Sequence, residues 1–154
     1  YPPNFYRLGK IYLSLGDERE AEKWFEKTIE VDPHSLPAYV ALGKLLFEEG
    51  KRKEAKAVFL KILEIERSPY EAAKPIAFFK EPAYPIAKLE LGKLMLKEKP
   101  REARKLLLEA VKQFEEYLST YRQWKVVMEK YTYVEEEEIE RYLLESKKLL
   151  KNLP

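Results

Sequence analysis

Three copies of the tripeptide Leu-Gly-Lys place a lysine directly after a glycine, at Lys10, Lys44 and Lys93. A lysine ammonium can form charge-assisted contacts with a partner's carboxylates. The neighbouring glycine needs its own explanation, because the chain has only five glycines. A glycine within a helix costs about 1 kcal/mol relative to alanine. Both residue types are therefore candidates for a repeated role.

The other reactive residue types do not assemble into a catalytic pattern. His34 is the single histidine, there are no cysteines, and Asp17 and Asp32 are the only aspartates. A lone histidine cannot build a zinc site, and phosphate-cradling glycine loops and nucleophile elbows are missing. The glutamates fall beside lysines at helix-surface spacing. We therefore expect no enzyme, no catalytic or metal-binding residues and no cofactor.

The composition is that of a globular protein. Hydrophobic residues make up 45% and charged residues 36% of the 154 residues, and the net charge is +2. This even balance disfavours nucleic acid as a partner, and no apolar run approaches a membrane span. A surface of Lys and Glu with few amides is typical of a thermophile, although both residues are also good helix formers. The chain opens Tyr-Pro-Pro, so we expect a monomeric fragment of a longer protein; the compartment stays open, with the cytoplasm favoured.

Several residues recur at an offset of 34 positions. The first two Leu-Gly-Lys copies obey this offset, and so do Gly16 and Gly50, Ala21 and Ala55, and Phe25 and Phe59. The period and the order aromatic–x₂–Leu-Gly, then Ala–x₃–Phe, then Pro33, resemble the tetratricopeptide repeat (TPR), a helix–turn–helix unit. The resemblance is strong over residues 3–67 and moderate over 85–112. It implies an all-α, right-handed TPR solenoid.

The third unit departs from the pattern in three ways. Lys88 stands where an aromatic residue is expected, the turn between helices is one residue short and carries Pro100, and no proline closes the unit. We therefore expect two TPRs over residues 1–66, an insertion over 67–84, a degenerate third repeat over 85–112, and a helical continuation with a capping helix over 113–154. All four segments are expected to form one domain.

Local signals support paired helices. Asp17-x-x-Glu20 is a capping box, and Ser35 can cap the next helix. Gly16 and Gly50 suit tight turns that need positive φ. The glycines of the Leu-Gly-Lys copies instead lie within first helices, where a missing side chain would let the second helix of each pair cross closely.

The insertion over 67–84 contains Ser68-Pro69-x-Glu71, which predicts a short helix before an extended connector. This insertion is expected either to pack between the repeats as an adaptor or to contact a partner as an arm. We favour the adaptor, because exposing Phe78 and Phe79 to solvent would be costly.

From Arg101 to Tyr131, apolar residues alternate in steps of four and three, which predicts one long helix. This stripe is either a coiled-coil seam or a surface covered by a final helix over 135–153 that folds back on it. We favour the second, because solenoid ends need a cap. Thr132-x-x-Glu135 is the expected capping box of that helix.

In TPR arrays the first helix of each pair lines a concave groove, so the resemblance implies that Lys10, Lys44 and Lys93 form a column in it. The peptide-carboxylate clamp of co-chaperone TPRs is absent, because Tyr6 and Ala41 replace its Lys and Asn. The groove then suits a segment with acidic residues between apolar anchors, or the lysines are ordinary solvated surface. Its expected lining consists of Tyr6, Arg7, Lys10, Val40, Lys44, Phe47, Leu89, Lys93 and Lys97, with Leu13, Ala41, Glu48, Glu90 and Leu96 nearby.

We therefore expect a protein–protein interaction scaffold or adaptor that binds an acidic and apolar segment of another protein. One alternative is an RNA-binding helical-repeat domain. Another is a regulatory TPR domain of a larger enzyme or assembly factor.

Overall fold

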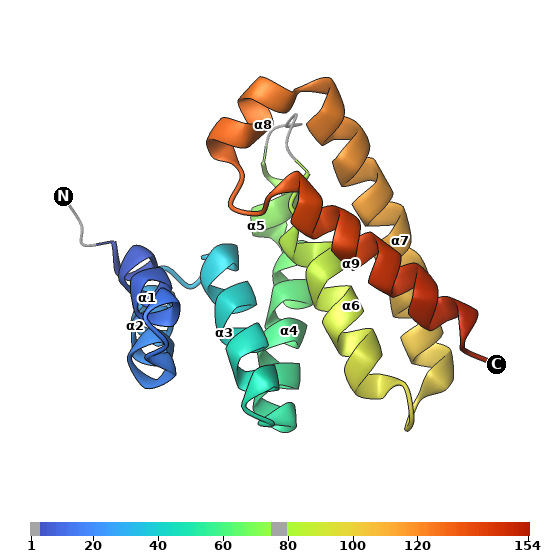
Figure 1. Ribbon diagram of the computed structural model, residues 1–154, viewed down its shortest axis with the longest axis horizontal. Helices are drawn as coiled ribbons and strands as arrows, with labels where there is room; N and C mark the ends of the chain where they lie inside the picture. Colours follow the sequence, from blue (N-terminus) through green and yellow to red (C-terminus); the bar gives the residue numbers. More distant parts are fainter. Residues whose placement is uncertain (1–3, 75–79) are drawn as a thin grey trace. The chain divides into compact units, whose positions relative to one another are not determined.

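A computed structural model of the chain describes residues 4–74 and 80–154, and all regular structure in these ranges is α-helical. Figure 1 shows the helices in chain order. Their bounds are α1 Phe5–Ser14, α2 Glu18–Val31, α3 Leu36–Glu48, α4 Arg52–Glu66, α5 Pro69–Ala72, α6 Ala83–Met95, α7 Pro100–Gln123, α8 Lys125–Tyr131 and α9 Glu136–Lys151. The expected all-α fold is confirmed. The chain divides into two compact units, residues 1–62 and 63–154.

The first unit consists of two helix pairs, α1 with α2 and α3 with the first part of α4. Each pair meets where a helix glycine faces an aromatic ring. A Cβ added at Gly9 would lie 2.5 Å from the Phe25 ring, and one added at Gly43 would lie 2.7 Å from the Phe59 ring. Both rings are fully buried. The predicted reason for the glycines, close passage of the second helix, is therefore confirmed.

The turns of this unit follow the sequence signals closely. Gly16 and Gly50 each have a φ of 79°, in the left-handed region that favours glycine. The Asp17 carboxylate accepts a hydrogen bond from the backbone N–H of Glu20 at 3.2 Å, as the capping box predicts. Ser35 occupies the N-cap of α3, but its side chain makes no capping hydrogen bond.

The second unit is built around α6. Ten consecutive residues of this helix, from Ala83 to Gly92, are buried. Its partner α7 passes close at Gly92, where an added Cβ would lie 2.9 Å from Leu107. Leu107 thus takes the place that the aromatic ring holds in the first two pairs. The structure shows that this third pair keeps the glycine contact despite its irregular sequence.

Helix α9 lies along α7 and also contacts α6 (Figure 1). The apolar stripe of α7 is buried there, including Leu107, Phe114 and Tyr117, and the Phe114 ring stacks on Tyr142 at 5.9 Å between centroids. The expectation that a final helix folds back over this stripe is confirmed.

Two details of this region were predicted wrongly. The long helix is interrupted at Trp124, whose φ of −120° and ψ of 39° separate α7 from α8. Thr132 does not cap α9, which begins at Glu136 with Glu135 as N-cap and no side-chain cap. The Thr132 hydroxyl instead lies 2.5 Å from the Tyr117 hydroxyl and accepts a hydrogen bond from the Val134 N–H at 3.2 Å.

The insertion begins as predicted. Ser68 caps the four-residue helix α5 by accepting a hydrogen bond from the Glu71 N–H at 3.3 Å. Phe78 and Phe79 lie outside the described residues. Helix α6 begins at Ala83, two residues before the expected start of the third repeat.

The contact between Gly43 and Phe59 makes a testable prediction about stability. Alanine in place of glycine should stabilise an unobstructed helix by about 1 kcal/mol. Here the added methyl group would overlap the ring, so we expect Gly43→Ala to lower the free energy of unfolding by about 1–3 kcal/mol. Chemical denaturation measures the change. In a Phe59→Leu background the same substitution should cost less, and a Gly43→Ala protein as stable as the parent would refute the packing argument.

A second prediction concerns the cover that α9 provides. Deleting residues 133–154 should expose the apolar stripe of α7 and cause self-association or loss of solubility, because large exposed apolar patches associate. The intact chain should sediment as a monomer. Sedimentation velocity of both proteins checks this, and an intact dimer with the α7 stripe at its interface would contradict it.

Candidate partner-binding site

In the first unit, two cations of the predicted site lie on the surface of α1. Arg7 and Lys10 are exposed, and Leu13 on the same helix keeps 38% of its surface exposed. Tyr6 is half-buried, with its ring 5.9 Å from that of Phe25. This helix therefore offers two positive charges next to accessible apolar surface.

Helix α3 supplies the equivalent positions of the second repeat. Lys44 and Phe47 are half-buried, and the Arg52 guanidinium lies 5.9 Å from the centre of the Phe47 ring. Val40 keeps only 7% of its surface exposed. The side chains of Lys44 and Phe47 thus remain partly accessible, whereas Val40 belongs to the core.

The predicted site residues of the second unit differ in how exposed they are. Leu89 is completely buried, so it cannot serve as an accessible apolar anchor in this structure. The prediction for this residue is wrong because α6 is surrounded by its neighbours. Lys97 is exposed. Lys93 lies in a different unit from Lys10 and Lys44, and the column of three lysines stays a prediction.

Lys93 is bound by two carboxylates of its own unit. Its ammonium lies 3.4 Å from Glu90, one turn earlier on α6, and 3.0 Å from Glu145 on α9. Burial lowers the pKa of Lys93, but the charges and hydrogen bonds of Glu90 and Glu145 outweigh it, so the pKa lies above its ordinary value. Lys93 is therefore positively charged and forms ion pairs with both carboxylates. No sequence motif links it to Glu145.

A buried polar cluster surrounds Lys88, the residue that breaks the repeat pattern. Its ammonium lies 3.0 Å from the Glu66 carboxylate and donates a hydrogen bond to the Gln113 side-chain oxygen at 2.8 Å. The Gln113 amide in turn donates to Glu66 at 2.9 Å. Lys88 thus joins α4, α6 and α7, and its buried charge is satisfied by partners. The cluster is a structural link.

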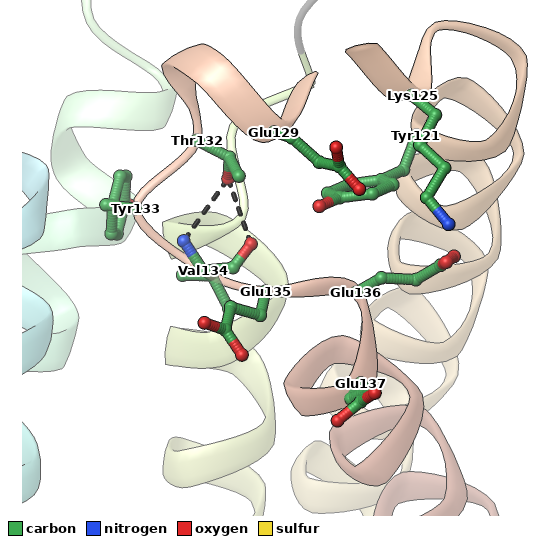
Figure 2. Close-up of a pocket in the computed structure, with 9 residues that line it drawn as sticks. All are labelled: Tyr121, Lys125, Glu129, Thr132, Tyr133, Val134, Glu135, Glu136 and Glu137. Carbon is green, nitrogen blue, oxygen red and sulfur yellow. Dashed lines mark hydrogen bonds between the residues drawn. The ribbon is translucent and has the colours of Figure 1, made fainter. Parts of the chain in front are cut away.

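A pocket of about 490 Å³ lies beside α8 and the start of α9 (Figure 2). Four glutamates and one lysine make it acidic, the opposite sign to Arg7 and Lys10. Burial, followed by the charges of Glu129 and Glu136, raises the pKa of Tyr121 within it. The lining residues are Tyr121, Lys125, Glu129, Thr132, Tyr133, Val134, Glu135, Glu136 and Glu137.

The helices pair repeatedly, and each pair meets at a glycine, so the fold is that of a helical-repeat protein. Residues 2–35 and 36–69 each match the sequence model of the tetratricopeptide repeat. Residues 2–69 therefore belong to the tetratricopeptide repeat family, and the predicted resemblance is confirmed. The third glycine pair lies beyond the matched residues.

One solved structure that resembles the chain is the crystal structure of MamA. The two share 15% sequence identity with a TM-score of 0.53, over 96% of this chain and 77% of that one. At this identity the likeness shows the fold alone. No curated protein sequence matches significantly.

The described helices and side chains also bear on metal and membrane sites. Within residues 4–74 and 80–154, His, Asp and Glu residues nowhere gather in a group of three placed to hold a metal ion. No helix in these ranges has the length and apolar character needed to cross a membrane.

The Lys88 cluster predicts a coupled effect on stability. Removing one partner of a buried ion pair costs about 3–5 kcal/mol, and because 22% of the Glu66 side chain stays exposed we expect Lys88→Met to fall at or below the lower end of that range. The double variant Lys88→Met with Glu66→Gln should recover much of the loss, since the closest carboxylate partner is then neutral and the remaining partner, Glu109, keeps 44% of its side chain exposed. Denaturation of the three proteins measures this coupling; additive losses would argue against the link.

Proposed function

We propose that the chain is a protein-interaction scaffold that binds an acidic and apolar segment of a partner protein through the lysine face, which we define as Arg7 and Lys10 on α1 with Lys44 and Phe47 on α3. The TPR match and the helical-repeat fold support the general role of scaffold. The choice of this face and of an acidic partner is our inference from the side chains.

The contact between Lys93 and Glu145 is the observation that carries the proposal. Lys93 follows the helix glycine, as Lys10 and Lys44 do, and it binds the carboxylate of an amphipathic helix at 3.0 Å. The same helix places the buried residues Tyr142 and Ser146 close to Glu145 in sequence. The chain thus contains an example of a post-glycine lysine that binds an acidic residue flanked by buried side chains.

The lysine face offers both parts of such a contact. Arg7 and Lys10 provide exposed positive charge, and Phe47 provides accessible apolar surface. Leu13, beside the lysine face on α1, adds further exposed apolar surface. A contact of this kind between wet side chains contributes about 0–1 kcal/mol per ion pair. We therefore infer modest, salt-sensitive affinity, with the apolar anchors supplying the rest.

The proposal predicts binding of a model acidic peptide. A fluorescently labelled peptide of repeated Leu-Glu-Glu should raise its anisotropy on titration with the chain, and raising the salt from about 50 to about 300 mM should weaken binding, since the screening length falls below about 10 Å. Lys10→Glu and Lys44→Glu should each weaken binding roughly three- to tenfold. Their melting temperatures should stay close to that of the parent.

Lys53→Glu on α4 is the matched control, because Lys53 is exposed and the charge change is the same. Its affinity should remain at the parental level. If Lys10→Glu and Lys44→Glu both bind the peptide with the parental affinity, the binding site lies elsewhere on the chain. An RNA-binding domain would be the better interpretation if labelled oligouridine bound more tightly than the acidic peptide and lost affinity in the same two variants.

A further inference from the structure

The pocket beside α8 differs from the lysine face in both its place and its charge. It lies wholly within the second unit, and its lining residues fall between 121 and 137. The end of α7, α8, the segment after α8 and the start of α9 all contribute to the lining. Its volume of about 490 Å³ is within the range of known ligand pockets, about 300–1,000 Å³.

The interior of this pocket carries a negative potential. Tyr121 and Val134 are its buried members, and each keeps 4% of its surface exposed. In Figure 2 the Tyr121 ring lies between Glu129 of α8 and Glu136 of α9. After burial, the charges of these two glutamates are the main causes of the raised pKa of Tyr121. Carboxylates of two helices therefore act on the same buried wall.

The fold itself uses only part of this negative charge. Arg122 pairs with Glu136 at 3.7 Å, and glutamates in the first turn of α9 suit the positive end of its dipole. Glu135 is the N-cap residue of α9 but makes no side-chain cap, and Glu129 belongs to another helix. Among the residues that the structure describes, neither these two glutamates nor Glu137 has a cation within ion-pair distance.

Exposed apolar surface borders the pocket. Val126 keeps 83% of its surface exposed. At about 100° per residue, it lies about 100° around α8 from Lys125 and about 60° from Glu129, and both of these residues line the pocket. The Val126 side chain is therefore at the rim. A partner segment that enters the pocket with one side chain can cover Val126 with the next.

We propose that this pocket binds an arginine side chain of a basic segment of a partner protein, and that an apolar residue beside the arginine packs on Val126. Charge complementarity selects the occupant, because the lining holds four glutamates and one lysine. Arginine fits better than lysine, since its planar guanidinium is weakly hydrated and can contact two carboxylates at once.

This site does not rest on the proposed acidic-peptide site. It belongs to the other unit and takes a ligand of the opposite charge. Lys10→Glu and Lys44→Glu should therefore leave binding at the pocket unchanged. Failure of one proposal has no bearing on the other.

The test titrates the full chain into a fluorescently labelled peptide of repeated Leu-Arg-Arg and follows anisotropy. We expect saturable binding. Glu129→Gln should weaken it at least about threefold, because one exposed ion pair is lost. Lys125→Gln should strengthen it, because the variant removes the positive charge of the lining. Val126→Ser should weaken it, and a peptide with lysine in place of arginine should bind less tightly.

Two matched controls lie in the same unit but outside the pocket. Glu115→Gln makes the same charge change at an exposed position of α7, and Leu144→Ser removes an apolar side chain of α9 that is 69% exposed. Both should bind the peptide with the parental affinity, and every variant should melt close to the parent.

Three outcomes would overturn the proposal. The first is that the peptide does not bind, or that Glu129→Gln and Glu115→Gln affect it equally. The second is that spermine binds as tightly as the peptide and Val126→Ser has no effect, because the site then takes a free polyamine. The third is that the intact chain self-associates and Glu129→Gln abolishes this, because the occupant is then a second copy.

Discussion

The close approach of two helices at a glycine is the constraint on which the rest of the structure depends. In each pair the glycine removes the side chain that would collide with a ring or a leucine of the second helix. The overlaps that a methyl group would cause, at 2.5 Å, 2.7 Å and 2.9 Å, show that all three contacts are tight. A helix propensity cost of about 1 kcal/mol per glycine is offset by the packing of fully buried Phe25, Phe59 and Leu107.

Charge is used in two ways in this chain. In the second unit, Lys88 and Lys93 point toward carboxylates of neighbouring helices, and these contacts join segments that are distant in sequence. In the first unit, Arg7 and Lys10 remain at the surface. The same residue type, and at Lys93 the same place after a glycine, therefore links helices in one unit and lies at the surface in the other. The net charge of +2 for the whole chain does not reveal this difference between the two units.

Periodicity predicted the parts of the fold that depend on local geometry. The helix pairs, the positive-φ turns at Gly16 and Gly50, and the covered stripe of α7 all followed from spacing, because they repeat or obey helical rules. The break at Trp124 did not, since neither glycine nor proline marks it. The burial of Leu89 and the contact of Lys93 with Glu145 also escaped prediction, because they depend on how neighbouring helices pack around α6, and no motif encodes such long-range contacts.

The cluster around Lys88 has a consequence for how freely the segment between α4 and α6 can vary in length. Glu66 and Lys88 are 22 positions apart, yet their side chains meet directly. The contact between Glu66 and Lys88 therefore holds the two ends of the segment between them in place, and no residue of that segment takes part in this contact. The entropy of closing such a loop rises only slowly, by about 0.6 kcal/mol for each doubling of length. The segment at this junction can therefore lengthen or shorten during evolution while the helix pair α6 and α7 that follows it keeps its packing.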